Sequence, residues 1–329
     1  MIVIVDKTFL TRSEEGKEQD VCDFISILEH GHYIEMNPLV KTAVTEIVEN
    51  SLSKPQKALY QEATEYLNPT RTMKRYLQFL NFYDYSYEQR KLLLLVPSEL
   101  LIENAPNEWP IYNRMSVVYK NDRCYYSVFS YVERAINETK MLKGVHCGGK
   151  GEIPKMISYK NQYEFDELYK HKVCILFDRD TDNDACFATD NNPIFRFLCN
   201  KDAAQVEESD IYKLDFGNGY VWHSWYKRAI ENYFPKIEYT KLGVDMTDYP
   251  DDDSYDYVKF PIEETKQWQK NHHKAKKDKQ RKKYQKNMME NIGISMTMKD
   301  YEKNLKSFDI QGIQLSELQL FLLKLAEIV

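Results

Sequence analysis

The chain has 329 residues, with 45 Lys and Arg against 51 Asp and Glu, a formal net charge of −6. This balance gives no global attraction to nucleic acid, and 43% hydrophobic residues is ordinary for a globular protein that buries a substantial core. The opening apolar run, residues 1–5, is too short for a signal peptide or membrane span, and no later run reaches about 18 apolar residues. We therefore expect a cytoplasmic protein without membrane contact.

Two further classes are excluded by missing motifs. The six cysteines form no C-x-x-C pair, which disfavours a zinc ribbon and favours reduced thiols in the core. The chain contains neither G-x-x-x-x-G-K-[ST] nor G-x-G-x-x-G, so it is not itself a P-loop ATPase or a dinucleotide-binding fold.

The first region, residues 1–90, predicts a small α/β unit, with a helix-rich fold as the alternative. Buried strands are expected at residues 2–5 and 33–36, and helices at 18–30, 38–52, 56–67 and 73–82. This order resembles a PIN-like ribonuclease, with Asp6 and Glu46 in the acidic places and Asp84 as the one further candidate. The interpretation we favour is a degenerate PIN-like scaffold or an unrelated adaptor.

The second region, residues 91–240, alternates strand and helix signals. Apolar strands are predicted at 99–102, 144–147, 173–177 and 211–216, and helices at 112–119, 127–142, 153–169 and 222–234. Apolar strands separated by helices indicate a mostly parallel sheet covered on both faces. The fold class predicted for the chain is therefore α/β.

The strongest local signal follows the strand at 173–177, where aspartates stand at alternate positions: Asp178, Asp180, Asp182 and Asp184. Carboxylates crowded at the carboxyl end of a strand repel one another unless a cation lies among them, and Mg²⁺ prefers oxygen ligands. An EF-hand is excluded because its required Gly and Glu are replaced by Asn183 and Thr189. The alternative is a polar loop that caps the next helix.

Three other segments join this cluster in order along the chain. Glu103 ends the strand at 99–102, a glycine-rich turn surrounds Gly149, and Glu231 lies near the end of the basic, aromatic segment 222–234. A glycine turn allows the backbone to approach an ion or a phosphate closely.

This ordered set resembles the Toprim domain, especially the Toprim nucleases of the OLD (overcoming lysogenization defect) type and their ATPase-partnered phage-defence relatives. The resemblance covers roughly the middle half of the chain and implies that Glu103, Asp178 and Asp180, with Asp182, hold Mg²⁺ or Mn²⁺ for phosphodiester chemistry. Glu231 resembles a recurrent glutamate of the same relatives. Asn104 stands where the family usually has a glycine.

The chemistry that the resemblance implies is metal-assisted hydrolysis, in which a nearby cation stabilises the phosphate in the transition state. The candidates are Lys150, Lys227 and Arg228, each of which is otherwise a surface charge. His223 is an open candidate for a general base, whereas His146 is interpreted as a satisfied side chain of the core.

The third region, residues 241–329, begins with an acidic loop at 246–256 and ends with a predicted amphipathic helix at 315–329. Between them, residues 266–286 hold ten Lys and Arg and one acid, Asp278, without Gly or Pro. This basic block predicts a solvated helix that contacts nucleic-acid phosphates, or else docks onto an acidic partner. Its candidate contacts are Lys274, Lys276, Lys277, Lys279 and Arg281.

The function predicted from these patterns is a metal-dependent nuclease acting on DNA or RNA, including tRNA, as the effector of a prokaryotic anti-phage system with a partner ATPase of the ABC or AAA type. The alternative is a non-catalytic Toprim-like subunit that binds nucleic acid or regulates a partner. A homo-oligomer is compatible with either function.

Overall fold

The computed structural model describes residues 1–64, 69–182, 187–214, 219–241, 243–260, 262 and 305–329. The basic block 266–286 and Asp184 lie outside the described residues, so the predictions that concern them are not compared with the structure. None of the helices in the described part of the chain is long and apolar enough to span a membrane.

The N-terminal unit is built on a three-stranded parallel sheet in the order β2–β1–β3. Its strands are β1 (Ile2–Val5), β2 (Tyr33–Met36) and β3 (Phe79–Asn81). The helices around it are α1 (Glu14–Glu29), α2 (Pro38–Ser51), α3 (Lys54–Ala63) and α5 (Tyr87–Leu94). The prediction of a small α/β unit agrees with this arrangement.

One predicted element of this unit is wrong. The helix expected at 73–82 ends early, because α4 (Arg71–Lys74) is one turn long and the chain then extends into β3. Leu80 lies opposite Val3 in the parallel ladder and is buried, so pairing with β1 overrides the local helical spacing.

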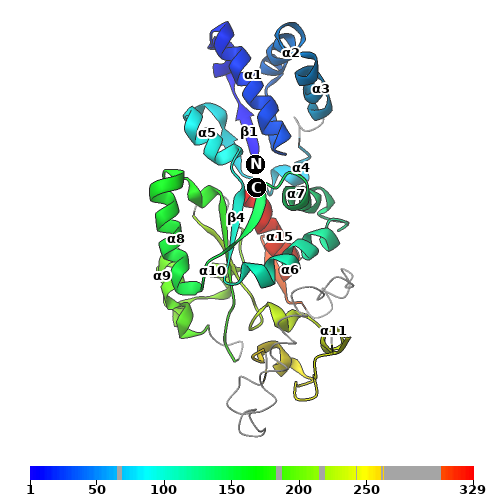
Figure 1. Ribbon diagram of the computed structural model, residues 1–329, viewed down its shortest axis with the longest axis vertical. Coiled ribbons are helices and arrows are strands. Elements are labelled where there is room, and N and C mark those ends of the chain that lie inside the picture. The colour runs from blue at the N-terminus through cyan, green and yellow to red at the C-terminus, as the bar shows by residue number, and fades with distance from the viewer. Residues whose placement is uncertain (65–68, 183–186, 215–218, 242, 261, 263–304) are drawn as a thin grey trace.

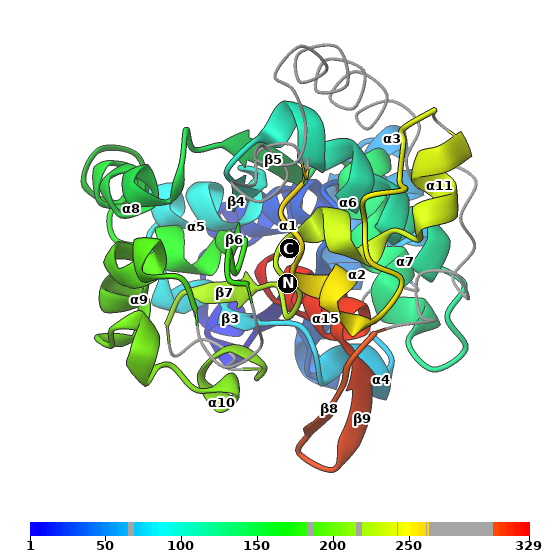
Figure 2. The same cartoon turned by 90° about the horizontal axis from the view of Figure 1, so that it is seen from below.

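The larger unit contains a four-stranded, all-parallel sheet in the order β5–β4–β6–β7. Its strands are β4 (Ser98–Ile102), β5 (Leu142–His146), β6 (Val173–Phe177) and β7 (Val221–Ser224). Figures 1 and 2 show the sheet with α8 and α9 on one side and α6, α7 and α15 on the other. The predicted α/β class with a parallel sheet covered on both faces is confirmed.

Four helices of the larger unit overlap predicted helices but differ from them at their ends, and three more, between residues 192 and 241, were not predicted. They are α6 (Ala105–Tyr119), α7 (Tyr126–Asn137), α8 (Ile153–Lys160), α9 (Asn192–Cys199), α10 (Glu208–Ile211), α11 (Lys236–Lys241) and α15 (Glu317–Ile328). After α8 the chain forms one π turn, Asn161–Phe165, which ends at Asp166 in the left-handed conformation with φ 46°.

Two predictions in the second half of the sheet are wrong. Residues 222–234 were expected as a helix, but Val221–Ser224 is the fully buried strand β7, and Ile230–Tyr233 is a short 3-10 turn. The strand expected at 211–216 is instead helical at its start, since Ile211 ends α10. In both segments the aromatic residues hide the periodicity, because buried rings suit a strand and a helix equally well.

The C-terminal helix α15 is central rather than peripheral. It follows a hairpin of β8 (Ser307–Ile310) and β9 (Ile313–Ser316) and packs against α7, β6 and β7. All its residues except Gln319 are buried, including three charged ones: Glu317, Lys324 and Glu327. The predicted C-terminal helix is therefore confirmed, and its tertiary neighbours cover its polar residues as well as its apolar ones.

The described residues form two hydrophobic cores, and the larger one extends into the N-terminal unit through Ile2, Tyr33 and Met73. One gathers around β1, α1 and α2 and includes Phe24 and Phe82, whose ring centroids are 4.9 Å apart. The other contains the four-stranded sheet and α15. The units meet at Tyr131, whose hydroxyl accepts a hydrogen bond from the Met1 amine (2.6 Å) and donates one to the backbone oxygen of Val329 (3.0 Å).

Candidate active site

The carboxyl ends of β4 and β6 bring the predicted acidic residues to one edge of the sheet. The two strands are parallel neighbours, with Leu101 opposite Ile175. Glu103 follows the end of β4 and Asp178 follows the end of β6. The two strands, separated by about 70 residues in the sequence, are therefore adjacent in the sheet.

The glycine turn after β5 reaches the same edge. Gly148 and Gly149 have φ of +74° and +123°, which side chains rarely allow, and a Cβ added to either residue would meet no atom within 4 Å. The turn therefore leaves open space beside its backbone. It leads directly into the 3-10 turn Lys150–Glu152.

Lys150 connects the turn after β5 to the residues that follow β4 and β6. Its side chain is only 8% exposed, and its ammonium donates to the Asp178 backbone oxygen (2.9 Å) and to Asp180 Oδ2 (2.6 Å). Glu103 Oε1 lies 3.7 Å from the same nitrogen. Because both oxygens lie this close to the same nitrogen, Glu103 Oε1 and Asp180 Oδ2 also lie close to each other.

Two further carboxylates interact with this group. Glu231, on the 3-10 turn after β7, and Glu108, in the first turn of α6, act electrostatically on Asp178 together with Asp180 and Glu103. Burial, followed by the repulsion from these carboxylates, raises the pKa of Asp178 well above its usual range. The pKa of Glu231 is raised to about 7, mainly by burial.

Some carboxylate oxygens of this cluster have no hydrogen-bond donor. Glu103 Oε1 and Glu231 Oε2 are inaccessible to solvent and accept no hydrogen bond. A buried carboxylate oxygen without a donor is costly, so such atoms point to a ligand that completes the site.

Asp180 is held in an unusual backbone conformation. Its φ is +56°, in the left-handed region, and its N–H donates to the Arg228 backbone oxygen (2.9 Å). Asn191 supports the same loop by donating to the Arg179 backbone oxygen (3.0 Å). Strain of this kind is typical of segments that position functional groups.

Two predicted residues lie in other ion pairs. The Lys227 ammonium binds Asp256 Oδ1 (2.5 Å), and the Arg228 guanidinium binds Asp182, whose side chain is 89% exposed. The ion pairs of Lys227 and Arg228 are therefore with Asp256 and Asp182, and not with Glu103 or Asp178. Asn104, at the position of the family glycine, has a φ of −134°, so no glycine is required there.

The structure gives His223, an open candidate for a general base, a place in the core, and it gives His146 an exposed one. His223 is fully buried, its Nε2 lies 3.2 Å from Glu317 Oε1, and burial holds its pKa well below the usual range. It is a structural residue of the core. His146, expected in the core, is exposed at the end of β5. Burial raises the pKa of Glu108, and His146 opposes this rise.

The PIN-like candidates do not form a comparable cluster. Asp6 accepts a hydrogen bond from the Thr8 N–H (2.7 Å), and its pKa is lowered chiefly by hydrogen bonding to Thr8. Glu46 and Asp84 are exposed. Asp6 thus caps the 3-10 turn that follows β1, as a scaffold residue does.

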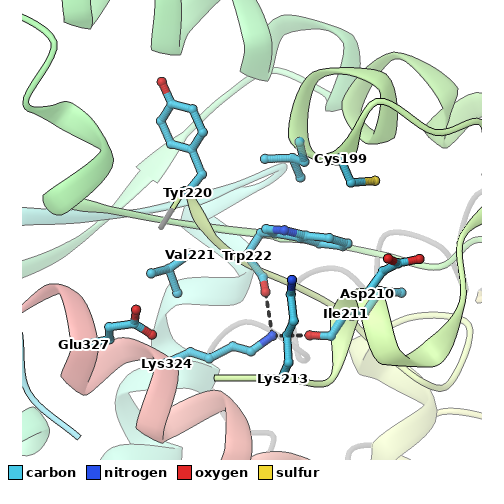
Figure 3. Close-up of a pocket in the computed structure, with 11 residues that line it drawn as sticks. Cys199, Asp210, Ile211, Lys213, Tyr220, Val221, Trp222, Lys324 and Glu327 are labelled. Atoms are coloured by element: carbon cyan, nitrogen blue, oxygen red, sulfur yellow. Dashed lines mark hydrogen bonds between the residues drawn. The ribbon is translucent and has the colours of Figure 1, made fainter. Parts of the chain in front are cut away.

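A separate cavity of about 120 Å³ lies beside β7, away from the predicted residues (Figure 3). The buried Lys324 ammonium, near its floor, donates to the backbone oxygens of Ile211 and Trp222. Because these bonds connect α15 to α10 and β7, we assign Lys324 a structural role.

The donor set of the carboxylate cluster suits a hard divalent cation, since it consists of carboxylate oxygens, two of them without a donor. In the described part of the chain, however, no three His, Cys, Asp or Glu side chains are already arranged around a common metal position. Lys150 lies between two of the predicted ligands instead.

Comparison with known proteins adds no relative: no family model, no curated protein and no solved structure matches this chain. The Toprim resemblance therefore stays a prediction that depends on the motifs alone. The sequence reasoning missed Glu108, five positions after Glu103 in the segment that starts α6. The available signal was its position in the first turn of a helix that follows the strand, since such a position is close to the carboxyl end of that strand.

Proposed function

We propose that the chain is a metal-dependent phosphodiesterase that hydrolyses nucleic acid. The observation that carries the proposal is that four carboxylates, Glu231, Glu108, Asp180 and Glu103, act electrostatically on the buried Asp178, while Lys150 pairs with Asp180 and lies 3.7 Å from Glu103. Such an excess of buried negative charge needs protons or cations, and Mg²⁺ or Mn²⁺ supplies the latter.

Glu103, Asp178 and Glu231 offer the oxygens that would hold the ion, while Asp180 is paired with Lys150. When bound, the ion supplies an acidified water and neutralises charge on the phosphate oxygens. The residues of the chain do the positioning: Lys150 holds the Asp178–Asp180 loop, and the glycine turn leaves space beside its backbone for a substrate. His146, exposed at the end of β5, is a candidate to move a proton.

The partners follow from the sequence. The basic block 266–286 is proposed to bind the phosphate backbone of the substrate, and the resemblance to ATPase-partnered nucleases suggests a separate ATPase as regulator. Both parts of the proposal rest on motifs and charge.

A second candidate is a non-catalytic subunit that binds nucleic acid or regulates a partner. The observation that favours it is Lys150, which already neutralises part of the charge between Glu103 and Asp180. In this case the ammonium would take over the structural role of the ion, and nucleic acid would be bound but not cut.

The two functions are distinguished by cleavage assays on DNA, RNA and tRNA with Mg²⁺, Mn²⁺ or EDTA. We expect Asp178→Asn and Glu103→Gln each to reduce the single-turnover rate at least about a thousandfold, roughly 4 kcal/mol of transition-state stabilisation. Asp190→Asn, at an exposed aspartate in the turn before α9, is the matched control and should cleave normally. Binding without any metal-dependent cleavage by the unmodified protein would favour the second candidate.

A further inference from the structure

We infer that Lys150 takes the place of a second metal ion, so that the carboxylate edge accepts one divalent cation and not two. This inference rests on the proposed function, and it changes the role predicted for Lys150 from a contact to nucleic acid into an internal cation of the site.

The position of the ammonium carries the inference. Lys150 Nζ lies 2.6 Å from Asp180 Oδ2 and 3.7 Å from Glu103 Oε1, which places it between residues at the ends of two neighbouring strands. A cation bridging two such carboxylates is what a pair of metal ions would otherwise provide. The third contact, to the Asp178 backbone oxygen at 2.9 Å, fixes the ammonium in this place.

The burial of Lys150 argues against a direct contact with a substrate phosphate. Only 8% of the side chain is exposed, and the three donors of the ammonium face three oxygens of the protein. Lysines that bind a nucleic-acid backbone contribute through exposed, exchangeable contacts. Lys155, five residues later and 72% exposed, shows what a solvated lysine of the same segment looks like.

The carboxylate oxygens that Lys150 does not bind closely are suited to one divalent ion. Lys150 is bound closely to Asp180 but only loosely to Glu103, whose Oε1 accepts no hydrogen bond. Glu231 Oε2, also inaccessible to solvent, accepts none either. Glu103, Glu231 and the Asp178 carboxylate therefore remain to bind a divalent cation, while Asp180 is engaged with the lysine. A second ion would have to displace Lys150 from its ion pair with Asp180.

The test is the number of Mn²⁺ ions bound by the metal-free, full-length protein, measured by calorimetric titration and by the electron paramagnetic resonance signal of free Mn²⁺. We expect one ion for the unmodified protein and for Lys150→Arg. Lys150→Gln should bind two ions, the first about tenfold more tightly, because a positive charge a few ångströms away is removed. Lys155→Gln, the matched control, should bind one ion with unchanged affinity.

A second variant tests the assignment of the ligands even if Lys150→Gln does not fold. Asp180→Asn should keep the single ion with an affinity within about threefold of the unmodified protein, whereas Asp178→Asn should lose it. Loss of the ion in Asp180→Asn would overturn the inference, because Asp180 would then be a metal ligand.

The other outcomes separate this inference from the proposed function. Two ions bound by the unmodified protein, or one ion bound by a folded Lys150→Gln, would overturn the role of Lys150 and leave the nuclease proposal intact. No ion bound by the unmodified protein would overturn both.

Discussion

Replacing Glu231 by Gln should stabilise the metal-free protein at alkaline pH. Glu231 lies among Asp178, Asp180, Glu103 and Glu108, and its pKa is raised from 4.5 to about 7. Each pH unit between the two values is worth about 1.4 kcal/mol, so the ionised carboxylate costs the folded state up to about 3 kcal/mol. Gln has nearly the same shape and carries no charge.

The sign of the pH dependence follows from the direction of the shift. Between pH 4.5 and about 7 the folded protein binds more protons at this site than the unfolded chain, so stability falls as the pH rises through this window. Below the window both states are protonated and the cost vanishes. Glu231→Gln should therefore be more stable than the unmodified protein at pH 8 and equally stable at pH 4.

The assay is chemical denaturation in EDTA at pH 4 and pH 8, with Glu49→Gln, at an exposed position of α2, as the control. Saturating Mn²⁺ should reverse the order at pH 8, because the ion stabilises the protein that binds it more tightly. If Glu231→Gln gains nothing at pH 8, or gains equally at both values, burial and the neighbouring carboxylates do not destabilise the ionised Glu231 as the structure indicates.

Three more perturbations have expected outcomes. Gly144→Ala should lower the free energy of unfolding by about 1–3 kcal/mol in denaturant titrations, since the added Cβ would lie 2.7 Å from a ring carbon of Trp109; a neutral effect would contradict this packing. Glu317→Ala should cost about 3 kcal/mol in the same assay, because the buried donors Tyr226 N–H and Tyr233 O–H lose their acceptor, and a stable variant would show that the network is dispensable. The last perturbation neutralises four lysines of the basic block, Lys274, Lys276, Lys277 and Lys279. It should weaken nucleic-acid binding, flatten the log–log dependence of binding on salt by up to about 4, and leave single-turnover cleavage at saturating substrate unchanged. Binding unaltered at every salt concentration would point to a protein partner for the block instead.

The sequence by itself determined the α/β class and the position of the acidic edge. Short apolar runs such as Val173–Phe177 are strands in any context that buries both faces, and a carboxylate directly after such a run lies at the carboxyl end of its strand. Caps are equally local: Asn37 accepts from the Val40 N–H, and Pro38 begins α2, as the pattern predicts.

The tertiary structure decided which of these residues meet. The order β5–β4–β6–β7 places β4 between two strands that come later in the chain, and this order alone brings Glu103 beside Asp178. Whether a charged side chain faces solvent or a partner was also undetermined by local patterns. Lys150 and Lys155 look alike in the sequence, yet one is enclosed by carboxylates and the other is solvated.

The aromatic segments show the physical reason most clearly. Val221–Ser224 became a strand and not a helix because a free edge of β6 was available to pair with it. Likewise α15 is buried on its polar face because Glu317 finds donors about 90 residues away, at Tyr226. Hydrogen bonds and ion pairs over such separations depend on the folded neighbours, whereas periodicity and capping depend only on residues a few positions apart.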